Sequence, residues 1–271
     1  PAFYQNQSVF RRLPENIAAE TSAGVKQLAL ETAGGRLRFS TDSEYIAISV
    51  KMPYIKRLSH MPMTGTTGFD LYLDSDGGSR YVKTFKPDAN IKGGYESLIR
   101  VGGRGMRSYT INFPSYNAVN ELYIGVSAKA RIEAGKEYRT KLPVVFYGNS
   151  ITQGACSSRP GLTYENMISR KYDLDYINLG FSGNGRAEPP IVNYMASLDM
   201  LAFVSDYDHN APSVDFLRDT HQRMYEIIRA AHHDIPYLMI SRCDFHGGED
   251  DCLRRDVVID TYRFAREHGD K

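Results

Sequence analysis

The sequence of 271 residues lacks the features that mark membrane and nucleic-acid-binding proteins. Its longest apolar stretches are far shorter than the roughly 20 residues that a membrane-spanning helix needs. It has no run of basic residues, and its formal net charge of +1 would attract neither nucleic acid nor an anionic membrane surface. We therefore expect no nucleic acid and no membrane as partner, and the sequence does not indicate an oligomeric state.

Cysteine is also scarce. The three cysteines, Cys156, Cys243 and Cys252, form neither a C-x-x-C pair nor a zinc-ligand pattern. Reduced thiols in a cytoplasmic protein are the simplest interpretation, and no charged and then apolar leader segment contradicts it. Phosphate-binding motifs of the G-x-x-x-x-G-K-[ST] and G-x-G-x-x-G types are missing as well. We expect neither a metal nor an organic cofactor.

Alternation of apolar and polar residues with period two dominates the chain up to about residue 140. This pattern predicts strands with one buried and one solvated face. The runs cover residues 37–39, 46–50, 69–73, 109–113 and 122–126, with glycine turns at 76–78 and 92–94. Apart from a possible helical turn near residues 15–20, no helix interrupts them. We predict an antiparallel β-sandwich of the jelly-roll type over residues 1–141.

The hydrophobic pattern changes after residue 141. Four short apolar runs without alternation, at residues 144–147, 176–179, 200–204 and 237–240, are typical of parallel strands covered on both faces. Helical patterns lie between and after them, the clearest starting behind Pro212 with Ser213 as its N-cap. Residues 142–271 are thus predicted to form a flavodoxin-like, doubly wound α/β domain with strand order 2-1-3-4.

Small polar residues follow three of these strands. Ser150, Gly183 and Asn210 each lie just beyond a strand's carboxyl end, where open parallel sheets bind their ligands. Acyl transfer through serine needs a nucleophile and donors that stabilise the oxyanion of the tetrahedral intermediate. Ser150 can supply the nucleophile, while the Gly183 backbone N–H and the Asn210 amide can supply donors. Each residue alone is more often part of a tight turn, so their placement on successive strands carries the hypothesis.

The segment 148–151, Gly-Asn-Ser-Ile, resembles the G-D-S-L block of the SGNH/GDSL hydrolases, with Asn149 in place of the usual Asp. Residues 178–183 and 208–210 resemble the second and third blocks of that family. The longer strings around these blocks are similar to the subgroup with an N-terminal β-sandwich, which includes some carbohydrate esterases and acyltransferases. The resemblance implies that Ser150 is the nucleophile and that Ser150, Gly183 and Asn210 hold the oxyanion.

The family's catalytic histidine belongs to a D-x-x-H block after a fifth strand, and this sequence ends after the helix that follows strand four. We therefore expect a chain truncated before that block. The only D-x-x-H string, residues 206–209, lies in the third block, where His209 should point away from Ser150 if Asn210 faces the oxyanion. His246 follows strand four and could reach the cleft rim, whereas His221 lies on the apolar face of its helix and is expected to be structural.

The interpretation that unites these features is a serine esterase that removes a small acyl group, most simply acetyl, from a carbohydrate. An acyltransferase on the same fold remains an alternative, because only the acceptor of the acyl group differs. A catalytically inactive glycan-binding protein is the third, since Asn149 and the missing histidine both depart from the family pattern. The sequence fixes neither the acyl group nor the sugar.

Overall fold

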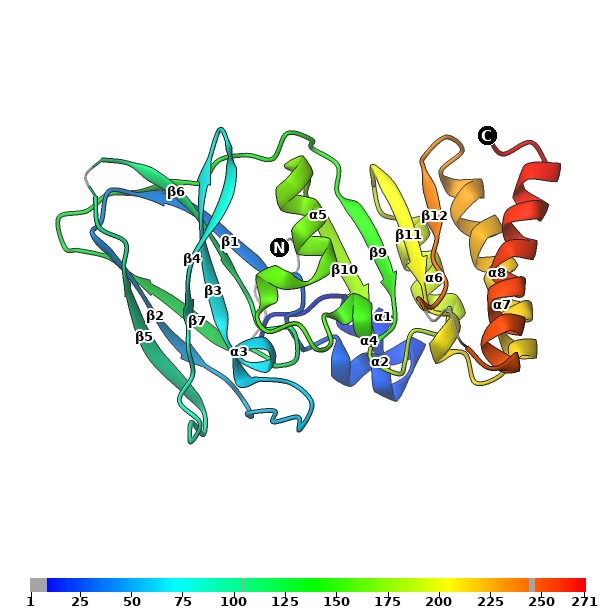
Figure 1. Ribbon diagram of the computed structural model, residues 1–271, viewed down its shortest axis with the longest axis horizontal. Helices are drawn as coiled ribbons and strands as arrows, with labels where there is room; N and C mark the ends of the chain where they lie inside the picture. The colour runs from blue at the N-terminus through cyan, green and yellow to red at the C-terminus, as the bar shows by residue number, and fades with distance from the viewer. Residues whose placement is uncertain (1–8, 104, 244–246) are drawn as a thin grey trace. The chain divides into compact units, whose positions relative to one another are not determined.

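The structure is a computed structural model that describes residues 9–103, 105–243 and 247–271 (Figure 1). The described chain divides into two units. The first contains residues 9–14, 29–141 and 153–175, and the second contains residues 15–28, 142–152 and 176–271 apart from the gap at 244–246. The chain thus passes between the units five times, after residues 14, 28, 141, 152 and 175. The division into domains at residue 141 stays a prediction.

Two antiparallel sheets build the first unit. The larger has the strand order β4-β3-β6-β1-β8 and the smaller the order β5-β2-β7. The strands are β1 (Arg36–Thr41), β2 (Tyr45–Lys51), β3 (Phe69–Ser75), β4 (Gly78–Phe85), β5 (Gly94–Arg100), β6 (Arg107–Asn112), β7 (Glu121–Gly125) and β8 (Ile132–Ala134). The predicted antiparallel strands are confirmed, and β4, β5 and β8 are additional to the expected runs.

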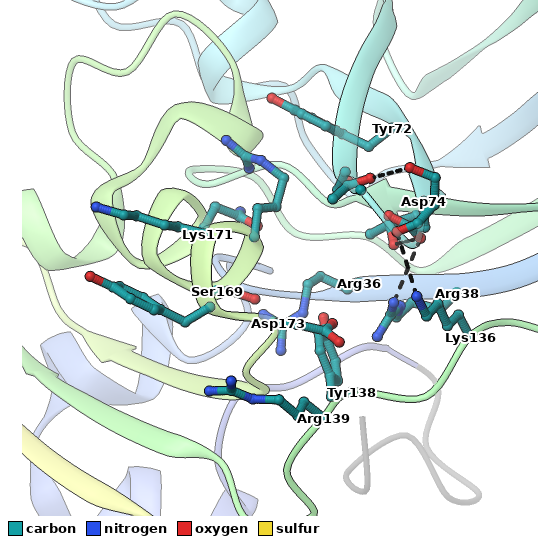
Figure 2. Close-up of a pocket in the computed structure, with 18 of the residues that line it drawn as sticks. Arg36, Arg38, Tyr72, Asp74, Lys136, Tyr138, Arg139, Ser169, Lys171 and Asp173 are labelled. Carbon is teal, nitrogen blue, oxygen red and sulfur yellow. Dashed lines mark hydrogen bonds and ion pairs between the residues drawn. The ribbon is translucent and has the colours of Figure 1, made fainter.

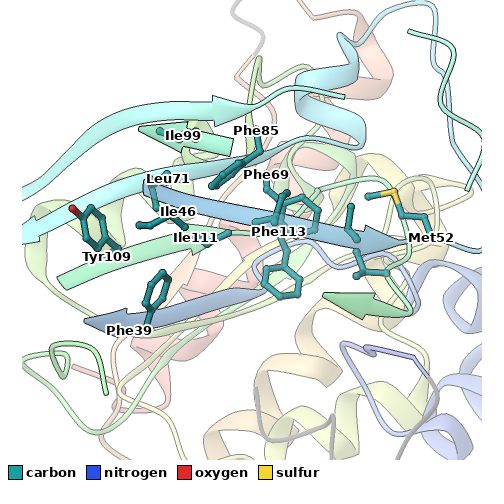
Figure 3. Close-up of a cluster of buried hydrophobic side chains, with 13 residues drawn as sticks. Phe39, Ile46, Met52, Phe69, Leu71, Phe85, Ile99, Tyr109, Ile111 and Phe113 are labelled. Atoms are coloured by element: carbon teal, nitrogen blue, oxygen red, sulfur yellow. The ribbon is translucent and has the colours of Figure 1, made fainter. Parts of the chain in front are cut away.

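An apolar cluster joins the two sheets of the first unit (Figure 3). Ile46, Ile48 and Val50 of β2 point into it, because alternate residues of a strand face the same side. Leu71 of β3 and Ile111 of β6 come from the larger sheet and are fully buried. Two faces with a shared core make this unit a β-sandwich.

The first unit also holds residues 153–175, which form η1 (Pro160–Leu162) and α5 (Tyr164–Tyr172), while α3 (Met63–Thr66) lies between β2 and β3. Asp70 of β3 is fully buried and accepts hydrogen bonds from Gly161 N and Asn112 Nδ2, both at 2.8 Å. Burial raises the pKa of Asp70 to about 6. The segment before α5 is therefore fixed to the sandwich by a buried polar contact.

The second unit is built on a parallel sheet with the order β10-β9-β11-β12, as Figure 1 shows. Its strands are β9 (Val144–Gly148), β10 (Tyr176–Gly180), β11 (Ala202–Asp206) and β12 (Tyr237–Met239). All five residues of β9 are buried, which explains why its sequence shows no alternation. The predicted order 2-1-3-4 is confirmed.

The helices of the second unit begin with one where the sequence predicted a helical turn and one that it did not predict. Near residues 15–20, where only a turn was expected, α1 (Glu15–Thr21) is followed by α2 (Ala23–Leu28). The others are α4 (Ser150–Gln153), α6 (Pro189–Ala196), η2 (Asp208–Asn210), α7 (Val214–Ala231) and α8 (Glu249–Glu267). None of the helices in the described ranges has the length and apolarity to cross a membrane. All three cysteines are unpaired.

Helix α7 confirms two predictions made from its sequence. Ser213 caps its N-terminus, since the Ser213 hydroxyl accepts a hydrogen bond of 3.1 Å from Phe216 N. His221 is packed in the interior, stacked on the Tyr207 ring and 2.8 Å from the hydroxyl of Thr261. Burial lowers the pKa of His221 to about 4, so that the packed ring is neutral at pH 7.

Candidate active site

The carboxyl ends of three neighbouring strands form the base of the site. In the sheet register, Gly148 of β9 lies opposite Gly180 of β10 and Asp206 of β11, so all three strands end at one level. The Gly148 carbonyl accepts a hydrogen bond of 2.9 Å from Phe181 N, and the Asp206 carbonyl accepts one of 2.9 Å from Asn149 N. The loops that carry Ser150, Gly183 and Asn210 therefore start from one edge of the sheet.

Ser150 is half-buried and begins α4, directly after Asn149. The Asn149 side chain is buried and fixed at both ends. Its Oδ1 accepts a hydrogen bond of 2.7 Å from Ile151 N, and its Nδ2 donates one of 3.1 Å to Oδ1 of Asp206. Asn149 thereby caps the first turn of the helix that presents Ser150.

Asp206 is the acidic residue of this site, and the sequence analysis predicted no role for it beside Ser150. It lies at the end of β11 with 7% of its surface exposed, and its Oδ2 accepts a hydrogen bond of 3.3 Å from the Thr152 hydroxyl. Burial, with a smaller contribution from the charge of Asp208, raises the pKa of Asp206 to about 6. An acidic residue ending a buried strand was the signal that could have identified it.

The partner of Asn149 also explains the departure from the G-D-S-L pattern. An aspartate at position 149 would place a second carboxylate beside that of Asp206, in a buried setting where like charges repel strongly. An asparagine instead donates a hydrogen bond to it. The exchange preserves the cap on Ile151 N, because the Oδ1 acceptor is present in both residues.

Gly183 lies at the tip of the turn that follows β10. The Phe181 carbonyl closes this turn by accepting hydrogen bonds from Asn184 N at 2.8 Å and Gly185 N at 3.0 Å. Gly183 is exposed and has a φ of +70°, which glycine adopts without steric cost. Its N–H has no hydrogen-bond partner among the residues that the structure describes. The turn thus presents an unused backbone donor.

Asn210 is the last residue of η2 and is held against the same turn. Its Nδ2 donates a hydrogen bond of 3.1 Å to the Phe181 carbonyl, while its backbone N–H donates to the Tyr207 carbonyl at 2.9 Å. One of the two amide hydrogens therefore fixes the side chain, and the other remains for a ligand. The structure brings Asn210 and the Gly183 turn together. The convergence of both donors with the Ser150 hydroxyl on one oxyanion stays a prediction.

Two histidines, His209 and His246, were considered as alternatives for the catalytic base, and the structure describes the first of them. His209 lies next to Asn210 with its Nε2 3.9 Å from Oδ1 of Asp208, too far for a hydrogen bond. His246 lies outside the described residues. Within the described ranges, no group of three or more His, Cys, Asp or Glu side chains is arranged to hold a metal ion.

Two family models together match nearly the whole chain. Residues 1–132 match the model of the N-terminus of SGNH-hydrolase-type esterases, and residues 141–263 match that of the GDSL-like lipase/acylhydrolase family. The chain belongs to the SGNH/GDSL family of ester hydrolases. The resemblance seen in the three sequence blocks is thereby confirmed, and a comparison with the sequences of curated proteins finds no match.

Three solved structures are similar to this chain in fold. A GDSL-like lipase from Bacteroides ovatus is 27% identical, with a TM-score of 0.88 over 97% of this chain and 79% of that chain. A salicylyl-acyltransferase from a tetracycline biosynthetic pathway is 20% identical, with a TM-score of 0.77 over 96% and 75% of the two chains. A family two carbohydrate esterase from Clostridium thermocellum, in complex with cellohexaose, is 13% identical, with a TM-score of 0.61 over 89% and 80%.

Proposed function

We propose that this SGNH/GDSL hydrolase is a serine esterase that removes a small acyl group, acetyl in the simplest case, from a carbohydrate. The observation that carries the proposal is the arrangement of the three strand ends. Ser150 begins a helix at the end of β9, and Asn210 is hydrogen-bonded to the turn that holds the unused Gly183 N–H. The carbohydrate rests on the likeness in fold to a carbohydrate esterase.

In this mechanism the Ser150 hydroxyl oxygen attacks the ester carbonyl carbon. The negative charge that develops on the carbonyl oxygen is stabilised by the Gly183 N–H and the free amide hydrogen of Asn210, at about 3 Å each. Collapse of the tetrahedral intermediate breaks the bond to the sugar oxygen, which takes up the proton that the base removed from Ser150, and leaves the acyl group on Ser150. Water then attacks this ester and releases acetate. The resemblance to the family implies a histidine of a D-x-x-H block as the base for both steps.

The test is hydrolysis of an activated acetate ester by the full-length protein, together with labelling by a serine-directed phosphonate. Ser150→Ala is expected to abolish both. Ser158→Ala is the matched control, since Ser158 lies in the following loop with an exposed side chain. Equal rates and equal labelling in wild type and Ser150→Ala would exclude Ser150 as the nucleophile.

The oxyanion donors are tested separately. Asn210→Ala is expected to lower kcat about 100- to 1000-fold with a smaller effect on KM, because the bond that it removes strengthens in the transition state. Asn193→Ala, on the exposed side of α6, should leave both constants unchanged. An effect of Asn210→Ala on KM alone would show that the side chain binds substrate without stabilising the oxyanion.

The acyl acceptor distinguishes this proposal from the acyltransferase alternative. Product analysis with an acetylated sugar and an excess of a second alcohol should yield free acetate as the main product. A new ester as the main product would indicate transfer, and glycan binding without turnover would indicate an inactive binding protein.

We also propose a jelly-roll topology for the first unit and a flavodoxin-like topology for the second. The division of strands β1 to β8 between two sheets supports a jelly-roll sandwich, and the order 2-1-3-4 supports a flavodoxin-like, doubly wound sheet.

A further inference from the structure

A cavity of about 340 Å³ lies inside the first unit, between the larger sheet, the segment 136–139 and α5 (Figure 2). This size is in the range of cavities that hold small ligands. Its lining is rich in cationic side chains: Arg36, Arg38, Lys136, Arg139, Arg170 and Lys171. The acidic residues of the lining are Asp74, Asp76 and Asp173, and Arg36 is also paired with Asp175 at 2.6 Å. The excess of positive charge favours an anionic ligand.

Two of these cations are held in place by aromatic rings. The guanidinium carbon of Arg38 lies 3.9 Å from the ring centre of Tyr138, and that of Arg170 lies 4.3 Å from the ring centre of Tyr72. Stacking of this kind fixes the plane of a guanidinium and leaves its edge for hydrogen bonds. Arg38 and Arg170 are therefore oriented before any ligand binds.

Neither arginine of this pair donates a hydrogen bond to a carboxylate in the described part of the chain, although the charge of Arg170 interacts with that of the buried Asp70. The contact between Nη2 of Arg38 and Oδ2 of Asp74 measures 3.7 Å, longer than a hydrogen bond, and the same oxygen accepts a bond of 2.6 Å from Thr110. Arg170 forms no ion pair within the described ranges. By contrast, Lys136 is paired with Asp76 at 2.8 Å.

Unused polar groups of the lining support the same conclusion. Nε and Nη1 of Arg38 and Nη1 of Arg170 are buried without a hydrogen-bond partner in the described part of the chain, as are Oγ of Ser79 and Oδ1 of Asn112. Buried polar groups are normally satisfied, so that several unsatisfied ones around one cavity indicate a polar ligand. The hydroxyl of Ser79 and the amide oxygen of Asn112 match the hydroxyl groups of a sugar.

We propose that this cavity binds a uronic acid residue, whose carboxylate pairs with Arg38 and Arg170 and whose hydroxyl groups bond to the neutral polar side chains. A planar carboxylate fits the fork of a guanidinium with two parallel hydrogen bonds. The site contains none of Ser150, Gly183 and Asn210 and does not depend on the proposed esterase activity.

Isothermal titration calorimetry of the full chain at low ionic strength tests the proposal. D-glucuronate and D-galacturonate are the probes, D-glucose is the neutral control, and inorganic sulfate and phosphate are the controls for a bare anion. One of the uronates is expected to bind at least about tenfold more tightly than any of the three controls, and added salt should weaken its binding.

Arg38→Gln and Arg170→Gln are each expected to weaken uronate binding at least about tenfold, since each removes a charged partner of the carboxylate. Arg255→Gln is the matched control, because Arg255 is exposed and belongs to the second unit. If the thermal transition shows that Arg38→Gln does not fold, Arg170→Gln carries the test.

The proposal is overturned if neither uronate binds at millimolar concentration, or if sulfate or phosphate binds as tightly as the uronates. It is also overturned if the variants at Arg170 and Arg255 bind alike. Ester hydrolysis is not part of this assay, so its outcome is independent of the role of Ser150.

Discussion

The contact between Asn149 and Asp206 ties the residue before the proposed nucleophile to a carboxylate on the neighbouring strand. Asn149→Asp should destabilise the protein by about 1–3 kcal/mol at pH 7, because a buried donor is replaced by a second negative charge. At pH 4 the penalty should be smaller, since the carboxyls then share protons. Urea unfolding of the variant and the wild type at both pH values measures this change in the free energy of unfolding.

Asn193→Asp provides the control for this exchange, since Asn193 is exposed on α6. It should change stability by less than about 0.5 kcal/mol. An equal effect of the two substitutions would contradict the assigned contact between Asn149 and Asp206.

Asp206 itself should give stability a dependence on pH. Its pKa is raised to about 6 in the folded protein from an ordinary value of 3.8. Between about pH 4 and pH 6 the unfolded chain loses this proton while the folded chain retains it, so the folded state loses stability as pH rises. Two pKa units correspond to about 3 kcal/mol. Asp206→Asn should therefore gain stability relative to wild type, by up to that amount, between pH 4 and pH 7.

Guanidinium unfolding across this pH range tests the prediction for Asp206. Asp199→Asn changes an exposed position, so its free energy of unfolding should depend on pH as that of the wild type does. If the free energies of unfolding of Asp206→Asn and wild type differ by the same amount at every pH from 4 to 7, the buried carboxylate is not protonated in the folded state.

At the level of elements, the turn after β10 offers two glycines with opposite constraints. A Cβ at Gly185 would lie 2.4 Å from the Gly148 carbonyl oxygen, whereas one at Gly183 would meet no atom within 4 Å. Gly185→Ala should displace the turn from the end of β9 and lower the free energy of unfolding by about 1–3 kcal/mol. The displaced turn should also lower kcat. Gly183→Ala should cost about 1–2 kcal/mol through its φ of +70° alone.

Urea unfolding and ester hydrolysis of both variants separate the effect of the steric contact at Gly185 from the effect of backbone strain at Gly183. The expected result is a larger loss of kcat in Gly185→Ala than in Gly183→Ala. A larger loss in Gly183→Ala would show that the tip of the turn, rather than its contact with β9, limits the geometry of the site.

Elements whose own side chains show an alternating or a continuous apolar pattern could be predicted from the sequence, and the others could not. Strand β2 alternates between buried and half-buried residues, and β9 is buried throughout, so their patterns reveal them. Strand β8 is exposed at all three residues and owes its place to pairing with β1, which leaves no trace in its composition. The same holds for the site: Ser150 follows a visible strand end, whereas the contact of Asn149 with Asp206 spans 57 positions.

At the scale of the whole molecule, the two units need not unfold together. Phe69 is fully buried in the sandwich core, so Phe69→Ala should lower the free energy of unfolding of the first unit by about 3–5 kcal/mol. Hydrogen exchange followed by mass spectrometry should then show faster exchange in peptides from β2 and β3 than in peptides from β9 and β11. Phe203→Ala, in β11, should give the reverse pattern. Equal acceleration everywhere in either variant would mean that the molecule unfolds as one cooperative unit.

The alternation of the chain between units has a consequence for its synthesis. The ribosome delivers residues in order, so β9 and Ser150 emerge before residues 153–175, which belong to the first unit. Until Gly161 has emerged, the buried Asp70 lacks one of its donors. Meanwhile β9 is an apolar strand without neighbours, because β10 and β11 have yet to be made. The nascent chain therefore passes through a stage with an unfinished sandwich and an unpaired core strand, the kind of surface that chaperones bind.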